Sequence, residues 1–252
     1  MIEIVDLKKS FQGQQVLQGV NLKIPKGGIL VIIGGSGAGK SVLLKHMIGL
    51  LRPDSGHIYV SGRDICRMKN WELRESRKKF GMLFQGAALF DSMTVGDNVA
   101  FPLREHARMR EREIQKRVRD MLGRVGLHGV EHKYPAELSG GMRKRVGLAR
   151  ALILEPEIVL FDEPTTGLDP IMSDVINRLI LSTQRKLSLT FVIISHDVKS
   201  AFLLADRIAF LYKGKIAAEG SPEEIRANPD PVLRQFLSGS AEGPLTAADL
   251  EA

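Results

Sequence analysis

The sequence predicts an α/β fold in which helices cover a mostly parallel sheet. Short apolar runs of strand length alternate with segments of helical periodicity, which is typical of parallel strands joined by helices. The longest apolar runs, at 29–33 and 191–194, are far shorter than the roughly 18 residues needed to span a bilayer. The 252 residues suit one large domain that carries a small subdomain.

The composition indicates a soluble, cytoplasmic protein. Hydrophobic residues make up 44% of the chain and charged residues 26%, which is unlike the composition of disordered proteins. A single cysteine, Cys66, excludes an internal disulfide framework and suits a reducing compartment. Residues 1–11 mix charges with apolar positions, unlike a secretory signal peptide.

The net charge of +7 is compatible with more than one kind of contact. Much of the positive charge lies at 104–122, among charges of both signs. Apolar residues recur here at helical spacing, which predicts a helix whose charged face is either solvated or in contact with anionic lipid. These apolar residues are Ile114, Val118, Met121, Leu122 and Val125.

The predicted elements follow in order along the chain. Short strands at 2–7 and 20–24 precede a buried strand at 29–33, a glycine-rich segment at 34–41, a helix at 41–51 and a strand at 57–62. Residues from about 70 to 155 are expected to be mainly helical, with an interruption at 80–98. Strand and helix then alternate at 157–163, 171–186, 189–195 and 199–205, and a hairpin follows at 206–220. Two prolines at 229 and 231 predict that the segment from 229 onward is extended rather than helical at its start.

The glycine-rich segment GGSGAGKS matches the phosphate-binding loop G-x-x-x-x-G-K-S/T. Its glycines let backbone N–H groups wrap phosphates, Lys40 supplies a cation to the β and γ oxygens, and the Ser41 hydroxyl can ligate Mg²⁺. The buried strand before the loop and the helix after it argue against a chance glycine turn. Val42 replaces a common Ser or Thr and offers only its N–H. The expected nucleotide-binding residues are Gly34, Gly35, Ser36, Gly37, Ala38, Gly39, Lys40, Ser41 and Val42.

A pair of carboxylates follows the buried strand at 158–161. We expect Asp162 to hold Mg²⁺, through water, and Glu163 to polarise the attacking water. Paired carboxylates after a strand can also cap a helix, but the phosphate loop favours the role in the site. The sequence therefore predicts that ATP, or another nucleoside triphosphate, is bound and hydrolysed.

A second glycine pair lies in LSGGM, residues 138–142, at the start of a predicted helix. Ser139 suits a helix cap, and the glycines expose backbone N–H groups to an anion. We expect this segment and the phosphate loop to lie at the ends of separate subdomains. Two chains arranged head to tail would then share each nucleotide. The residues expected to act in trans are Ser139, Gly140, Gly141 and Met142.

The order of these motifs resembles that of the ATP-binding cassette (ABC) ATPases over roughly residues 1–225. The resemblance implies a P-loop NTPase core with a mostly parallel sheet, an antiparallel β subdomain and a helical subdomain. It implies an ATP-binding domain at 1–237, with the helical subdomain at roughly 86–155, and a C-terminal tail at 238–252. Met142 replaces the usual glutamine, and activity is expected to survive because Ser139 and backbone N–H groups make the phosphate contact.

The same resemblance implies roles for four more residues. Phe11 is similar to the aromatic residue that stacks on adenine, and Gln85 to the glutamine that reaches Mg²⁺ and the water. Asp169 resembles the acidic residue of the loop that crosses the dimer interface. His196 resembles the switch histidine that contacts the γ-phosphate, so the expected catalytic residues are Lys40, Glu163 and His196.

Four longer segments, at 41–56, 84–103, 138–152 and 228–237, resemble the ATPase subunits of Mla/MCE-type transporters. The resemblance implies the homodimeric motor of a complex with a membrane permease and an MCE-type lipid-binding protein, at the cytoplasmic face of the inner membrane. Phospholipid would be moved between envelope membranes. The alternatives are an amino-acid or lipoprotein transporter, or a soluble ATPase for iron–sulfur assembly or nucleic-acid work. Nucleic acid is not expected as a partner, because the chain shows no sustained coiled-coil heptads.

Two further expectations concern contacts with other subunits. Leu89, Phe90, Met93 and Val95 are expected to form a groove for a cytoplasmic helix of the permease, although they could instead pack inside the protein. The resemblance to Mla/MCE-type ATPases implies that the tail at 238–252 reaches the other ATPase subunit and holds the dimer together, and a flexible tail is the alternative.

Overall fold

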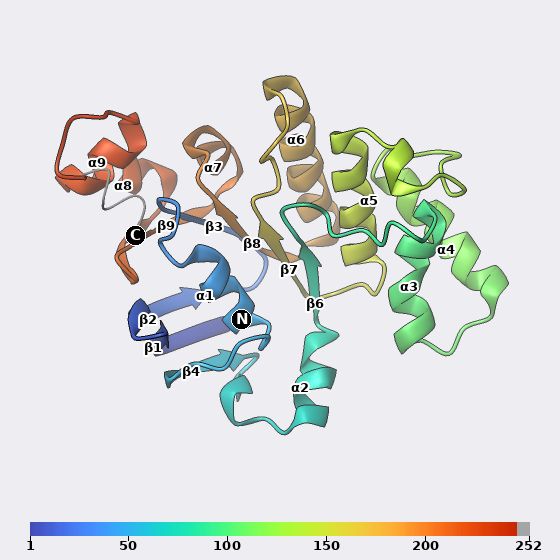
Figure 1. Cartoon of the computed structure of the whole chain (residues 1–252), viewed down its shortest axis with the longest axis horizontal. Coiled ribbons are helices and arrows are strands. Elements are labelled where there is room, and N and C mark those ends of the chain that lie inside the picture. Colours follow the sequence, from blue (N-terminus) through green and yellow to red (C-terminus); the bar gives the residue numbers. More distant parts are fainter. Residues whose placement is uncertain (246–252) are drawn as a thin grey trace. The chain divides into compact units, whose positions relative to one another are not determined.

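The computed structural model describes residues 1–245, which divide into two compact units. The first unit comprises Met1–Arg77 and the chain from Thr190 onward, and the second comprises Lys78–Leu189 (Figure 1). Within residues 1–245, no helix has the length and hydropathy needed to cross a membrane.

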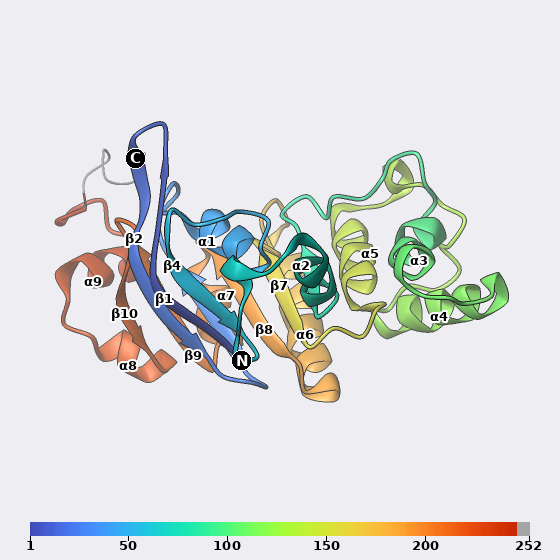
Figure 2. The same cartoon turned by 90° about the horizontal axis from the view of Figure 1, so that it is seen from below.

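An antiparallel sheet forms one layer of the first unit (Figure 2). Its strand order is β2-β1-β4-β5, with β1 at Ile2–Phe11, β2 at Gln14–Ile24, β4 at Ser55–Val60 and β5 at Arg63–Asp64. The first two strands are longer than expected because Gln12 and Gly13, both with positive φ, form a two-residue hairpin turn. The hairpin places Phe11 at the end of β1, opposite Gln14.

The first unit also contains the mostly parallel strands that the sequence predicts. Their order is β10-β9-β3-β8, and β3 runs parallel to both β8 and β9, whereas β10 pairs antiparallel with β9. The strands are β3 (Ile29–Ile33), β8 (Thr190–Ser195), β9 (Arg207–Tyr212) and β10 (Lys215–Gly220). The helices of this unit are α1 (Lys40–Met47), α2 (Asn70–Arg77), α7 (Val198–Leu204), α8 (Pro222–Ala227) and α9 (Pro231–Ser238), with a 3-10 turn at Ile65–Arg67. Every residue of β3 and β8 is buried, as expected for parallel strands covered on both faces.

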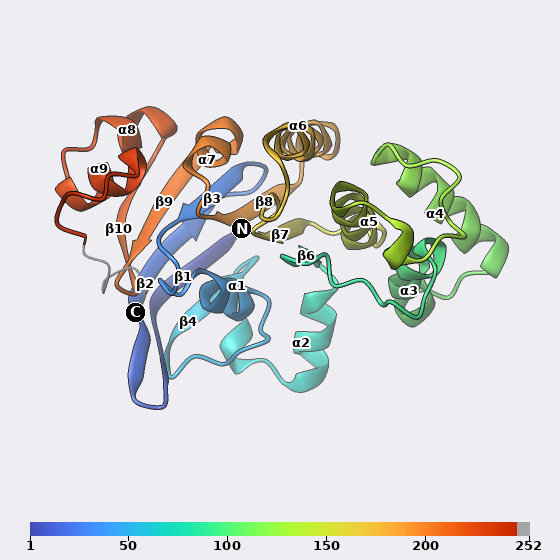
Figure 3. The ribbon, with the colours of Figure 1, turned by 45° about the horizontal axis from the view of Figure 1, so that its top comes forward.

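The second unit is mainly helical around a parallel pair of strands, β6 (Phe80–Leu83) and β7 (Ile158–Asp162). Its helices are α3 (Val95–His106), α4 (Glu111–Arg124), α5 (Gly140–Leu152) and α6 (Pro170–Leu187), with a 3-10 turn at Pro135–Glu137. Helix α5 contacts α3, α4, α6 and β6, and its position between α4 and α6 is visible in Figure 3. The apolar residues of α4 are buried and its charges lie outside, so the amphipathic helix is confirmed.

Two local predictions are wrong. Pro231 does not extend the chain but is the first residue of α9, where its missing N–H and fixed φ suit a helix start. Asp230 caps this helix by accepting the N–H groups of Val232 and Leu233, each at 2.9 Å. Val95 is not exposed but fully buried, because it opens α3 directly after the capping residue Thr94.

Part of the predicted tail folds onto α9. The backbone N–H of Leu245 donates to Oε1 of Gln235 at 2.6 Å, and the Leu245 side chain is buried. Residues 246–252, the remainder of this predicted tail, lie outside the described residues.

Candidate functional site

The phosphate loop joins β3 to α1, and its glycines are required by close contacts. A Cβ atom on Gly34 would collide with the carbonyl oxygen of Leu211 in β9. Gly39 caps α1 with a φ of 93°, a conformation that favours glycine. The Lys40 ammonium donates to the carbonyl oxygens of Gly34 and Gly35, at 2.8 Å each, and the side chain is 8% exposed. The predicted phosphate-binding cation is therefore buried within the loop.

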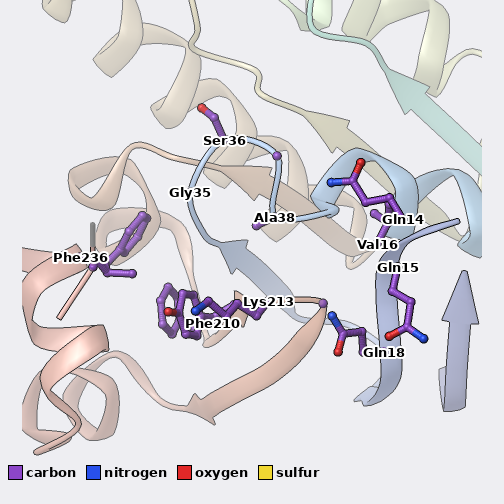
Figure 4. Close-up of a pocket in the computed structure, with 14 residues that line it drawn as sticks. Gln14, Gln15, Val16, Gln18, Gly35, Ser36, Ala38, Phe210, Lys213 and Phe236 are labelled. Atoms are coloured by element: carbon purple, nitrogen blue, oxygen red, sulfur yellow. The ribbon is translucent and has the colours of Figure 1, made fainter. Parts of the chain in front are cut away.

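A cavity of about 260 Å³ lies beside this loop, within the first unit (Figure 4). Residues 35–38 of the loop and 14–16 of β2 line it on two sides, and Phe210 and Lys213 lie on a third. Phe11, just before this part of β2, is 42% exposed and has the Lys9 ammonium 5.3 Å from its ring centroid. The first unit thus combines the predicted phosphate loop, a cavity and an accessible aromatic ring.

The pairing of β3 with β8 fixes where the predicted switch histidine lies. The parallel register pairs Ile33 with Ser195, so the chain leaves both strands at the same edge of the sheet. Gly34 follows one strand and His196 follows the other, and the His196 side chain is exposed. The structure therefore brings His196 to the sheet edge from which the phosphate loop begins.

The two carboxylates lie at the end of β7 in the second unit. Asp162 and Glu163 are 9% and 8% exposed, and Glu163 has a φ of 50°, in the left-handed region that a glutamate rarely adopts. Thr166 donates its hydroxyl to Oε2 of Glu163 at 3.1 Å, which fixes the carboxylate. Strained backbone of this kind is typical of functional sites.

Helix α6, which follows the carboxylate pair, is capped by Asp169. This observation tests the alternative that Asp162 and Glu163 cap a helix. Asp169 accepts the N–H groups of Ile171 and Met172, each at 3.0 Å. Asp162 and Glu163 therefore are not the caps of this helix. The capping role of Asp169 was missed, although a helix-starting proline directly after an aspartate was its signal.

The LSGGM segment begins α5 as predicted. The Ser139 hydroxyl accepts the N–H of Met142 at 3.3 Å and caps the helix. Gly141 is buried so closely against Met172 that a Cβ atom would collide with the methionine methyl group. Ser139 itself is exposed, so the start of α5 is accessible from outside the second unit.

Lys144 in α5 is a site residue that the sequence reasoning missed. Its side chain is 5% exposed, and its ammonium donates to the carbonyl oxygens of Gln85 and Glu163. Burial lowers the pKa of Lys144, and the nearby charges of Asp162 and Glu163 oppose that shift. The sequence did contain an indication of its burial, because Lys144 lies on the same face of the predicted helix as the buried residues Gly141, Leu148 and Leu152.

A second cation in α5, the half-buried Arg150, holds the segment after Gln85. The Arg150 guanidinium donates to the carbonyl oxygens of Ala87 and Ala88, at 2.7 and 2.8 Å, and lies 5.8 Å from the ring centroid of Phe90. Burial lowers the pKa of Arg150. Both alanines have positive φ, 62° and 46°, so this arginine supports an unfavourable backbone conformation.

The loop that carries Phe90 is fixed by a buried amide. Asn98 of α3 accepts the N–H of Phe90 at 2.8 Å and donates to the carbonyl oxygens of Phe90, Met93 and Thr94, at 3.0–3.2 Å. The Phe90 side chain is 43% exposed, whereas those of Leu89 and Met93 are half-buried. We call the surface of Leu89, Phe90 and Met93 the apolar loop surface.

Sequence and structure comparisons identify this arrangement as an ATP-hydrolysing cassette. Residues 17–166 match the model of the ABC transporter family. The chain belongs to the ABC transporter family, as the motor subunit that hydrolyses ATP. Cassettes of this family dimerise and work with membrane permeases.

Particular relatives refine this assignment. The chain is 43% identical over 245 residues to the intermembrane phospholipid transport system ATP-binding protein MlaF of Haemophilus influenzae, covering 97% of this chain and 93% of that protein. It is 46% identical over 244 residues to the probable ribonucleotide transport ATP-binding protein mkl of Mycobacterium leprae, covering 97% and 70%. A solved dimeric ATP-binding cassette in a post-hydrolysis state, bound to ADP and Pi, matches with a TM-score of 0.81 and 31% identity, covering 88% of this chain and 99% of the other. The predicted cassette fold and the resemblance to Mla-type ATPases are confirmed.

Proposed function

We propose that this ATPase drives the movement of phospholipids between envelope membranes. The observation that carries the proposal is the 43% identity to a phospholipid-transport ATPase over 93% of its length. The working complex would contain two copies of this chain, a membrane permease and an MCE-type lipid-binding protein. The ATPase would lie at the cytoplasmic face of the inner membrane.

In this proposal each ATP lies between two chains. The phosphate loop and Phe11 of one chain bind the nucleotide, and Ser139, Gly140, Gly141 and Met142 of the other meet its γ-phosphate. The burial of Lys40 inside the loop and the exposure of Ser139 at the start of α5 support this division of roles. Asp169, at the start of α6, would cross the dimer interface.

The predicted metal donors fit Mg²⁺. The Ser41 hydroxyl, the Gln85 amide oxygen and the Asp162 carboxylate are all hard oxygen ligands, which this ion prefers when it binds together with phosphates. Across the described part of the chain, no group of three or more His, Cys, Asp or Glu side chains forms a closed metal cage. Bound Mg²⁺ would offset the negative charge that develops on the phosphate oxygens.

The remaining chemistry is assigned to this chain's own side chains. Glu163 accepts a proton from the attacking water, and Thr166 orients its carboxylate. Lys40 stabilises the charge on the β and γ oxygens, and His196 contacts the γ-phosphate from the neighbouring strand end. The proton passes to the Glu163 carboxylate as the new P–O bond forms and ADP leaves.

The apolar loop surface is the proposed docking site for the permease. Phe90 is exposed although its backbone is fixed by Asn98 and its ring is covered on one side by Arg150. An exposed aromatic ring on a fixed loop suits a pocket or helix of a partner protein. Its neighbours Leu89 and Met93 would widen the contact.

A second candidate substrate comes from the mycobacterial relative, whose name states probable ribonucleotide transport. The test is to purify the complex from membranes and identify its bound small molecules by mass spectrometry. ATP hydrolysis by the complex in phospholipid-free detergent is then measured with added phospholipid or with an added ribonucleotide other than ATP and ADP. Phospholipid enrichment and stimulation are expected. Enrichment of ribonucleotides other than ATP and ADP, without phospholipid, would contradict the proposal and support the second candidate.

A further inference from the structure

Lys144 joins two segments that are distant in the sequence. Gln85 lies 59 residues before it and Glu163 lies 19 residues after it, and the Lys144 ammonium donates to the backbone carbonyl of each. One segment follows β6 and the other follows β7, and Lys144 lies in α5. Lys144 thus connects the segment of Gln85, the proposed metal ligand, with the segment of Glu163, the proposed general base.

The burial of this cation is not explained by packing alone. An ammonium group that leaves water loses a large solvation energy, which two carbonyl contacts and the nearby charges of Asp162 and Glu163 offset. The neighbours Gly141, Leu148 and Leu152 on the same stripe are buried without charge, so Lys144 is the charged member of this stripe. We therefore attribute the presence of a lysine at this position to the contacts of its ammonium group with the carbonyls of Gln85 and Glu163.

The backbone at both ends of the bridge has an unfavourable conformation. Glu163 has a φ of 50°, and Ala87 and Ala88, just after Gln85, have φ of 62° and 46°. A residue in the left-handed region keeps that conformation only if surrounding contacts hold it. Lys144 holds the carbonyl of Glu163, and Arg150 holds those of both alanines.

We propose that Lys144 is a positioning residue for ATP hydrolysis, which holds the backbone of Glu163 in register with that of Gln85. This inference rests on the proposed role of Glu163 as the general base. The site that binds the nucleotide phosphates is not altered by the bridge, because Lys144 acts through Glu163 and Gln85.

The test compares variants of the full chain in the purified transporter complex. Lys144→Met keeps the length of the side chain but removes both donors, whereas Lys144→Arg keeps the charge and the donors. Arg145→Met is the matched control, because Arg145 is the next residue of α5 and also donates to a backbone carbonyl, that of Gly126, at 3.2 Å. For each variant, kcat and KM for ATP and the thermal midpoint are measured.

Lys144→Met is expected to lower kcat by about 10-fold or more, since small misplacements of a catalytic group have effects of this size, and to leave KM within about twofold. Lys144→Arg is expected to restore most of kcat. Arg145→Met should keep the parent kcat, even if its thermal midpoint falls. Equal losses of kcat in Lys144→Met and Arg145→Met, or a loss confined to KM, would overturn the inference.

A double variant separates this inference from the assignment of the base. If Lys144 acts through Glu163, adding Lys144→Met to Glu163→Gln should lower the residual rate by less than about twofold, because the two changes remove the same contribution. A further 10-fold loss would overturn the positioning role. If Glu163→Gln alone hydrolyses ATP at the parent rate, the base assignment fails instead. Should Lys144→Met not fold, Lys144→Leu, which also removes the donors, takes its place, and the parent kcat in Lys144→Leu would equally overturn the inference.

Discussion

Glu163 combines three properties that are unusual in one residue: a buried carboxylate, a left-handed backbone and a hydroxyl donor aimed at its Oε2. The carboxylate was predictable from the sequence, because it follows a buried strand in a chain with a phosphate loop. The backbone conformation and its supports were not predictable. They depend on Thr166 and Lys144, and only the first of these is local in sequence.

The first prediction concerns this residue. Glu163→Gln keeps the size of the side chain but cannot accept the proton of the attacking water, so the hydrolysis rate should fall by about 10²–10⁴-fold while ATP still binds. Phosphate release measures the rate, and the mass of the protein with and without ATP and Mg²⁺ reports dimerisation. The ATP-bound dimer is expected to be more stable than that of the parent. Hydrolysis at the parent rate would contradict the role of Glu163.

Helix α1 contains a buried histidine whose protonation should affect stability. The His46 side chain is fully buried, and its Nδ1 lies 2.7 Å from the carbonyl oxygen of Val42, so Nδ1 carries the hydrogen and donates. Burial lowers the pKa of His46 below its ordinary value. In the unfolded chain the pKa returns to about 6.5.

The second prediction follows from that difference. As the pH falls, His46 is protonated in the unfolded chain before it is protonated in the folded protein. The contribution of neutral His46 to the free energy of unfolding is therefore present above the unfolded pKa and is lost as the pH falls below it. Through His46, the free energy of unfolding should fall by up to about 1.4 kcal/mol per pH unit below about pH 6.5. Urea unfolding at pH 7.5 and 5.5 measures the effect. In His46→Gln this part of the pH dependence should vanish, and an unchanged slope in that variant would exclude His46 as its source.

The third prediction concerns the loop before α3. Phe90→Glu or Met93→Glu should abolish co-purification with the permease, because a charge in an apolar contact must be desolvated without a partner. ATP binding should stay intact. Trp71→Glu is a matched control, since Trp71 is an aromatic residue that is 65% exposed on α2. Retained co-purification of both loop variants would place the docking site elsewhere.

The loop before α3 also shows why the ends of helices were harder to predict from the sequence than the helices and strands themselves. Val95 and its apolar neighbours suggested one exposed group, but Thr94 starts a helix and turns Val95 inward. At Pro231 the error was similar, because a proline suits the first turn of a helix as well as an extended segment. Both outcomes depend on a capping side chain one residue earlier, Thr94 or Asp230. The strands and long helices were predictable because periodic burial repeats over many residues.

The whole transporter provides the test of the shared nucleotide site. Ser139→Arg places bulk and charge where the partner's γ-phosphate is expected, and Lys40→Ala removes the cation of the chain's own phosphate loop. In a mixed dimer, one composite site would contain both changes and the other would contain neither. The fourth prediction is that phosphate release partly returns when the two inactive variants are mixed. Two sites that each lie within one chain would show no recovery.

The position of functional residues along α5 limits how its length can change. Ser139 precedes the helix, Lys144 lies within it and Arg150 lies near its end, and each has a separate set of contacts. Inserting one residue between Ser139 and Lys144 would turn everything after it by about 100° relative to Ser139 and move it by about 1.5 Å. Either the start of the helix or both cations, Lys144 and Arg150, would then lose their partners. Insertions and deletions should therefore be tolerated in the loop at 107–110, and not between residues 139 and 150.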